Sequence, residues 1–204
     1  MGYYKKVTDD VTVYTTQQMK AQFSNTSFPA GEIPENAFAQ LGIEAVELAP
    51  YPTYDPELEY PVLDGCEKIL NIWYTKWRIV EIQFDPLTVE ANKRYELSEL
   101  RYEKESAGVS IWGKQIDTDK VSQAMLVTTL FNLEHNFVSI AEWKTREGKW
   151  ITCTLQELTQ IADLVAKHVQ SCFVKEQQLL AKFTALATTR ERVKFNLRNE
   201  WDLL

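Results

Sequence analysis

Apolar side chains recur at intervals of three and four positions over residues 155–186, and this spacing predicts one long helix. The repeat has the form of a heptad seam with a single polar break, at Glu176. Further apolar positions such as Ile161 and Ala187 widen the stripe, which is typical of a helix that packs in a bundle or on other subunits. About 33 helical residues span about 50 Å, more than the rest of such a domain can cover, so we expect the helix to bind other chains. The predicted oligomer or partner interface consists of Leu158, Val165, Val169, Phe173, Leu179, Leu180 and Phe183.

Two helices and a strand are expected between residues 85 and 133. Asp85 and Pro86 are typical of a helix start, and a connecting helix is predicted over residues 87–107. A strand is expected at residues 109–112, and aspartates precede a second helical run at residues 120–133. The connecting helix has a narrow apolar stripe, which is typical of a connector or of a partner in a contact between several helices. The stripe consists of Leu87, Ala91, Tyr95 and Tyr102, with Leu97 and Leu100 to its side.

A hairpin is predicted from residues 137–144 and 150–154, with Gly148 in the turn. Trp143 and Trp150 flank this turn, and we expect them to pair across the two strands. The basic side chains of the turn are expected to be solvated, because acidic residues lie among them.

The first part of the chain is predicted to consist of short strands and loops. Residues 3–7 and 11–15 alternate around a turn and indicate a hairpin. Residues 50–61 contain four prolines and are expected to be an extended, tyrosine-bearing segment. Asp64-Gly65 is then expected to turn the chain before a strand at residues 69–82.

Composition changes sharply along the chain. All seven prolines lie within residues 1–86, which carry a net charge of -7, while residues 87–204 are neutral overall. This shift predicts an acidic, β-rich N-terminal domain over 1–86, a connecting helix over 87–107 and an α+β C-terminal domain over 108–204. The predicted fold class is therefore α+β.

Composition also excludes several classes of protein. The acidic balance argues against a nucleic-acid partner. No run of 18 apolar residues is present, so no membrane insertion is expected, and the N-terminus lacks the apolar core of a secretory signal. Three widely spaced cysteines without a CxxC pair indicate reduced thiols in a cytosol.

No catalytic, metal or cofactor site is predicted. The chain contains no glycine-rich phosphate loop, no GxSxG and no HExxH motif. His168 and Cys172 share a helix face, but no spacing supplies further zinc ligands, so a packed pair is favoured. Asp117 and Asp119 are interpreted as helix-capping residues rather than ligands of a cation.

Several ordered motifs of the second part resemble a known family. They are Arg101-Tyr102-Glu103 with Glu105, Gly108 and Gly113, Asp117-Thr118-Asp119 with Ser122-Gln123-Ala124, Trp143-Lys144 and Gly148-x-Trp150, and His168-Val169-Gln170 with Cys172-Phe173 and Glu176. Together they resemble an uncharacterised domain that recurs in small tail proteins of tailed bacteriophages. The first part is also similar to leaders of small phage tail and tail-fibre proteins, in the segment NTSFPAGEIPENAFAQLGIEAV at residues 25–46, followed by Tyr54-Asp55-Pro56 and by the strand with Trp73 and Trp77.

This resemblance implies a non-enzymatic bacteriophage tail protein without known catalytic residues or cofactors. The first hypothesis is a structural component, either a small tail fibre or an adaptor between fibre and baseplate, with other phage tail proteins as partners. It would be a homo-oligomer, with a trimer favoured, in the virion tail and in the host cytoplasm during assembly. The second hypothesis is a tail-fibre assembly chaperone, which would cover apolar surface of an immature fibre and leave before maturation. A chaperone and an adaptor need similar adhesive surfaces.

A third hypothesis is a receptor-binding tail module that recognises a cell-surface glycan. Aromatic side chains can stack on sugar rings. The proline-rich segment offers a docking loop formed by Tyr51, Tyr54 and Tyr60, and Trp112 is a further candidate.

Overall fold

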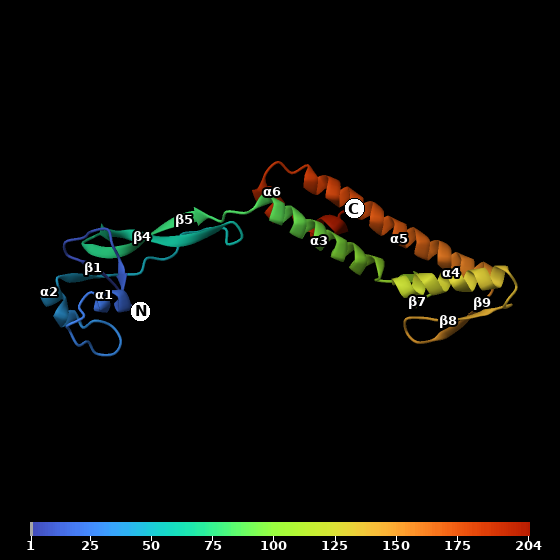
Figure 1. Ribbon diagram of the computed structural model, residues 1–204, viewed down its shortest axis with the longest axis horizontal. Helices are drawn as coiled ribbons and strands as arrows, with labels where there is room; N and C mark the ends of the chain where they lie inside the picture. The colour runs from blue at the N-terminus through green and yellow to red at the C-terminus, as the bar shows by residue number, and fades with distance from the viewer. Residues whose placement is uncertain (1) are drawn as a thin grey trace. The chain divides into compact units, whose positions relative to one another are not determined.

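The computed structural model describes residues 2–204 and divides into two compact units (Figure 1). Unit 1 ends at Gln83, and unit 2 comprises Phe84–Leu204. Helices and small antiparallel sheets make up both units, and the predicted α+β class is confirmed.

Unit 1 begins with a three-stranded antiparallel sheet in the order β2-β1-β3. The hairpin expected near the N-terminus is present, because Tyr3 pairs with Thr15 and Tyr4 with Tyr14. The core of this part is formed by Tyr4, Met19, Ile33 and Ile43. The elements are β1 (Tyr3–Lys6), β2 (Tyr14–Thr15), α1 (Thr16–Ala21), η1 (Glu35–Ala37), α2 (Phe38–Leu41) and β3 (Ile43–Val46).

A long hairpin of β4 (Glu59–Ile69) and β5 (Ile72–Glu81) completes unit 1. The turn predicted at Asp64-Gly65 is wrong: the register shifts between Leu63 and Cys66, so these residues form a bulge inside β4. The chain reverses instead at Leu70 and Asn71, whose φ angles of 48° and 68° are both left-handed. Two-residue turns with left-handed φ angles match the right-handed twist of the strands that they connect. Leucine is not a typical turn residue, so the sequence gives no signal for this turn.

Lys5 lies in the interior of unit 1 with 1% of its side chain exposed. Its Nζ is 2.8 Å from Asp10 Oδ1 and 2.8 Å from Glu44 Oε2, and it lies 4.2 Å from the Trp73 ring centroid. A buried ammonium needs such partners, because an unpaired charge is costly to remove from water.

Unit 2 is organised around the 30-residue helix α5 (Leu155–Thr184), with α3 (Pro86–Glu105) and then α4 (Lys120–Glu134) alongside it (Figure 1). Asp85 caps α3, and Thr154 with Glu157 forms a capping box at the start of α5. The remaining elements are β6 (Val109–Ile111), β7 (Lys114–Ile116), β8 (Ala141–Lys144), β9 (Trp150–Cys153), α6 (Thr189–Lys194) and α7 (Leu197–Asp202).

Two hydrophobic cores line opposite ends of α5. The first joins the N-terminal half of α5 to α4 and the hairpins, with Leu158, Ile161 and Val165 buried against Leu126 and Trp143. The second joins the C-terminal half to α3 and α7 and contains Leu97, Leu100, Cys172, Leu179, Leu197 and Trp201. Residues 188–204 therefore do not extend α5 but fold back on it as two short helices.

The strand expected at residues 109–112 is present as β6, and after a turn in which Trp112 and Gly113 both have positive φ the chain forms a second strand, β7, that was not expected from the sequence. Two expectations for unit 2 are wrong in detail. Trp143 and Trp150 do not pair: Trp143 opposes Ile151 and is buried, whereas Trp150 opposes Lys144 and is 65% exposed. The predicted stripe of α3 faces solvent, with Leu87 77% exposed, because Leu97 and Leu100 make the contact with α5.

Candidate functional site

An exposed apolar face on α4 is the candidate functional site of unit 2. The helix is capped by Asp119, whose carboxylate accepts hydrogen bonds from the backbone N–H groups of Val121 at 2.9 Å and Ser122 at 3.1 Å. The Ser122 hydroxyl donates a third bond of 2.7 Å to the same carboxylate. These three hydrogen bonds hold the pKa of Asp119 below its ordinary value. The bond from the Ser122 hydroxyl lowers the pKa most.

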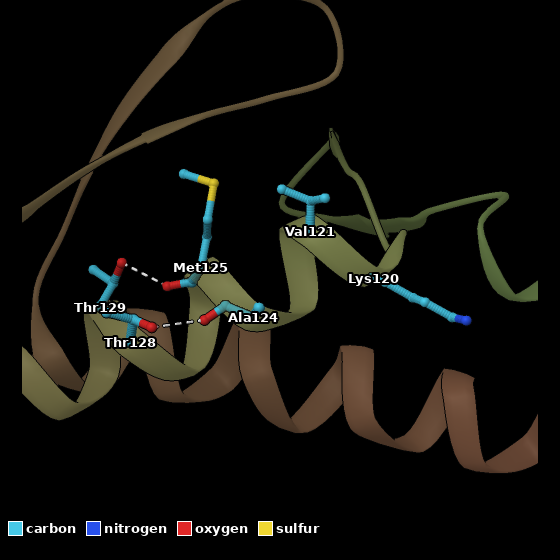
Figure 2. A pocket seen from close by; sticks show the side chains of 6 residues that line it. All are labelled: Lys120, Val121, Ala124, Met125, Thr128 and Thr129. Atoms are coloured by element: carbon cyan, nitrogen blue, oxygen red, sulfur yellow. Dashed lines mark hydrogen bonds between the residues drawn. The ribbon is translucent and has the colours of Figure 1, made fainter.

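Between its terminal residues, α4 contains no charged side chain. Val121, Val127 and Phe131 are 68%, 68% and 51% exposed, and Met125 is 57% exposed. Figure 2 shows Val121 and Met125 pointing away from α5, which packs on the other side of α4. A contiguous face of large apolar side chains on a folded surface indicates a contact with another molecule.

The polar atoms of this face are already satisfied within the helix. Thr128 Oγ1 donates to the Ala124 carbonyl at 2.9 Å, and Thr129 Oγ1 donates to the Met125 carbonyl at 2.8 Å (Figure 2). These residues, with Lys120 and Val121, line an open groove of about 490 Å³. Covering the groove would therefore leave neither threonine hydroxyl without a partner.

An aromatic cluster continues the face at the C-terminal end of α4. The rings of Phe131 and His135 stack at 4.0 Å between centroids, and Phe137 lies 6.2 Å from Phe131 and 5.8 Å from His135. His135 Nδ1 lies 2.9 Å from the Phe131 carbonyl oxygen. Because Phe137 is 68% exposed, the cluster extends the apolar surface beyond the helix.

A buried polar joint supports the other side of α4. Glu105, with 5% of its side chain exposed, accepts from Arg101 and from Gln123 Nε2 at 3.1 Å. Arg101 Nε also lies 3.2 Å from Glu176 Oε2 of α5. Paired charges thus connect α3 with α5, as low-dielectric surroundings require, and the Gln123 amide connects α4 to them by a hydrogen bond.

Thr118 and His168 complete this joint through the end of α3. Thr118 donates to the Glu105 carbonyl and accepts from the Gly108 N–H at 3.0 Å, and Gln123 Nε2 donates to the Thr118 carbonyl at 2.7 Å. His168 Nε2 lies 3.1 Å from the carbonyl oxygens of both Lys104 and Glu105. His168 is therefore occupied with backbone groups at the end of α3.

Arg146 is anchored by several partners, although 42% of its side chain is exposed and the basic side chains of its turn reach solvent as expected. Its guanidinium donates to the carbonyls of Ala107 and Ser106, the latter at 2.9 Å, and pairs with Asp117 Oδ1 at 2.5 Å. Asp117 is thus an ion-pair partner, whereas Asp119 alone provides the helix cap. The β8–β9 hairpin is tied in this way to the segment between α3 and β6.

Most of the predicted α5 interface lies inside unit 2. Leu158, Val165, Leu179 and Phe183 are buried in the unit, and Val169 and Leu180 are partly buried against its two cores. Residues 188–204 and the neighbouring helices cover the surface that the sequence pattern assigned to partners. Of the predicted set only Phe173 is exposed, at 45%, and its ring lies 4.6 Å from the Arg101 guanidinium.

The three tyrosines of the predicted docking loop are accessible in unit 1. Tyr51, Tyr54 and Tyr60 are 60%, 36% and 47% exposed. They do not form one platform: Tyr51 packs on Trp77 at 4.5 Å between ring centroids, whereas Tyr60 lies in β4 opposite Val80.

The described residues 2–204 contain no group of three or more acidic, histidine or cysteine side chains arranged to hold a metal ion. Within the same range, no helix has both the length and the apolarity needed to cross a membrane. Cys153 and Cys172 are buried, and burial raises the pKa of both thiols. Raised pKa values disfavour the reactive thiolate.

The α4 face was missed by sequence reasoning, because apolar residues surround the helix and give no clear period. A usable signal was present: residues 121–133 lack any charge, although they form a surface helix.

The chain has an α+β fold, and its helix α4 presents an exposed apolar surface. Residues 88–196, a little over half of the chain, match the family described as "Domain of unknown function (DUF4376)", and the chain belongs to this family. No curated protein and no solved structure matches the sequence.

The cap of α4 provides a first test of how this site is held. We expect Asp119→Ala to lower the free energy of unfolding of unit 2 by about 0.5–2 kcal/mol, the usual cost of losing a capping side chain. Because folding lowers the pKa of Asp119, its contribution is present at neutral pH and is lost as pH falls below the ordinary aspartate value of 3.8. Chemical denaturation at neutral and acidic pH measures both effects. A pH-independent difference between the variant and the parent would contradict this role.

Proposed function

We propose that this protein is a non-enzymatic structural component of a bacteriophage tail, as a small fibre component or an adaptor that attaches a fibre to the baseplate. The observation that carries the binding role is the uncharged, exposed face of α4, formed by Val121, Ala124, Met125, Thr128 and Phe131. A structural component acts through such surfaces and needs no reacting group.

The tail setting is supported by the resemblance of the second part of the chain to a recurrent domain of phage tail proteins. Several of the residues that carry this resemblance meet in the buried joint, namely Arg101, Glu105, Thr118, Gln123 and Glu176. Together these residues fix α4 against α3 and α5. The motifs that carry the resemblance therefore also hold the helix that bears the exposed face.

Mass spectrometry of purified virions, from a phage that encodes this protein, tests the proposal. The protein is expected in mature particles, and Met125→Glu is expected to reduce its incorporation about tenfold, because a buried unpaired carboxylate opposes docking. Val7→Glu, at a 55% exposed position of unit 1, is the matched control. Absence from mature virions, together with a gain in soluble fibre on co-expression, would overturn the structural role and identify an assembly chaperone.

A further inference from the structure

We infer that the α4 face binds the α4 face of a second copy of this chain, with the two helices antiparallel about a two-fold axis. The inference deepens the proposed function, since it uses the same face and names one occupant. The evidence is the placement of the charges that bound the face.

The two charged residues of α4 are its first, Lys120, and its last, Glu134. They are separated by about four helical turns, or about 21 Å along the axis, so they lie on nearly the same flank of the helix. In an antiparallel pair related by a two-fold axis, this flank of one helix adjoins the same flank of the other. Lys120 of each copy then meets Glu134 of the other copy at both ends of the interface.

The helix itself does not account for these two charges. A cation is unfavourable at the positive N-terminal end of a helix, and an anion is unfavourable at the negative C-terminal end. The first turn of α4 has no acidic residue and the last turn no basic one. Within the chain, Lys120 Nζ lies 5.6 Å from the Tyr102 ring centroid, a contact that its ammonium can keep while also facing a carboxylate. Antiparallel pairing would turn both unfavourable placements into attractions between copies.

The surface between the charges suits close self-association. Val127 is the midpoint of Lys120 and Glu134, and the small residues Ala124 and Thr128 lie beside it. Small side chains at a crossing point let two helices approach closely. An isologous interface also places Val121 of one copy near Phe131 of the other, so large exposed apolar groups at the ends become covered.

Sedimentation equilibrium of the full chain, with charge variants, tests this inference. The parent protein is expected to dimerise, and Lys120→Glu to raise the dissociation constant about tenfold or more, because it sets two carboxylates against each other at both ends of the interface. The double variant Lys120→Glu, Glu134→Lys is expected to restore the dimer. Lys149→Glu, in the exposed turn of the β8–β9 hairpin, is the matched control and should not change association.

A protein that is monomeric over the whole concentration range would overturn the inference, as would a dimer or trimer that Lys120→Glu does not weaken. Failure of the double variant to restore association would also exclude the antiparallel arrangement. These results are independent of the virion experiment: a dimer absent from virions would overturn the proposed function and leave this inference in place.

Discussion

Arg101→Ala is expected to lower the free energy of unfolding of unit 2 by about 3–5 kcal/mol, the cost of breaking a buried ion pair from one side. Arg101 lies between Glu105 and Glu176, and only 5% of the Glu105 side chain is exposed. Without the guanidinium, two carboxylates would face each other in a region of low dielectric. The Phe173 ring would also lose its cation.

Chemical denaturation followed by the helical circular dichroism signal measures this loss. Arg94→Ala provides a matched control on the same helix, because Arg94 forms an exposed pair with Glu90 at 2.8 Å. An exposed pair of this spacing contributes about 0.3–0.5 kcal/mol. Equal effects for the two variants would show that the joint does not hold the three helices together.

Phe183→Ala is expected to cost about 3–5 kcal/mol, as truncation of a fully buried phenylalanine usually does. Phe183 is 2% exposed and lies 6.0 Å, between ring centroids, from Phe195 in the segment that folds back over α5. The residual cavity would lie between α5 and this returning segment. The loss of stability should therefore appear in the same denaturation transition that Arg101→Ala affects.

Phe173→Ala is the comparison for this variant, since it removes the same atoms from the same helix. Phe173 is 45% exposed, so we expect a loss of about 1 kcal/mol, mainly from its contact with Arg101. A loss at Phe173 as large as that at Phe183 would show that this side of α5 is covered in solution, in line with the interface expected from the sequence pattern alone.

The fold could be predicted where a local signal decides it. Asp85, Asp119 and Thr154 each precede a helical run and each caps the helix that follows. Gly148 likewise marks the turn of the β8–β9 hairpin. Leu70 carries no such signal, and its left-handed turn became visible only through the pairing of β4 with β5.

The site could not be predicted from periodicity because burial depends on partners distant in sequence. The stripe of α5 was correctly interpreted as apolar, but Leu197 and Trp201, more than ten residues beyond its end, cover part of it. The stripe of α3 was likewise visible, yet Leu97 and Leu100, not Tyr95, turned out to face α5. For α4, the absence of charge between its first and last residues carried more information than the positions of its apolar residues.

The return of residues 188–204 also determines when the molecule can fold during its synthesis. Leu97 and Leu100 leave the ribosome about a hundred residues before Trp201, the side chain that closes their core. Domains commonly fold as units while translation proceeds from the N-terminus. Unit 1 can complete its own interior early, whereas the nascent second unit must keep part of α3 uncovered until Trp201 has emerged.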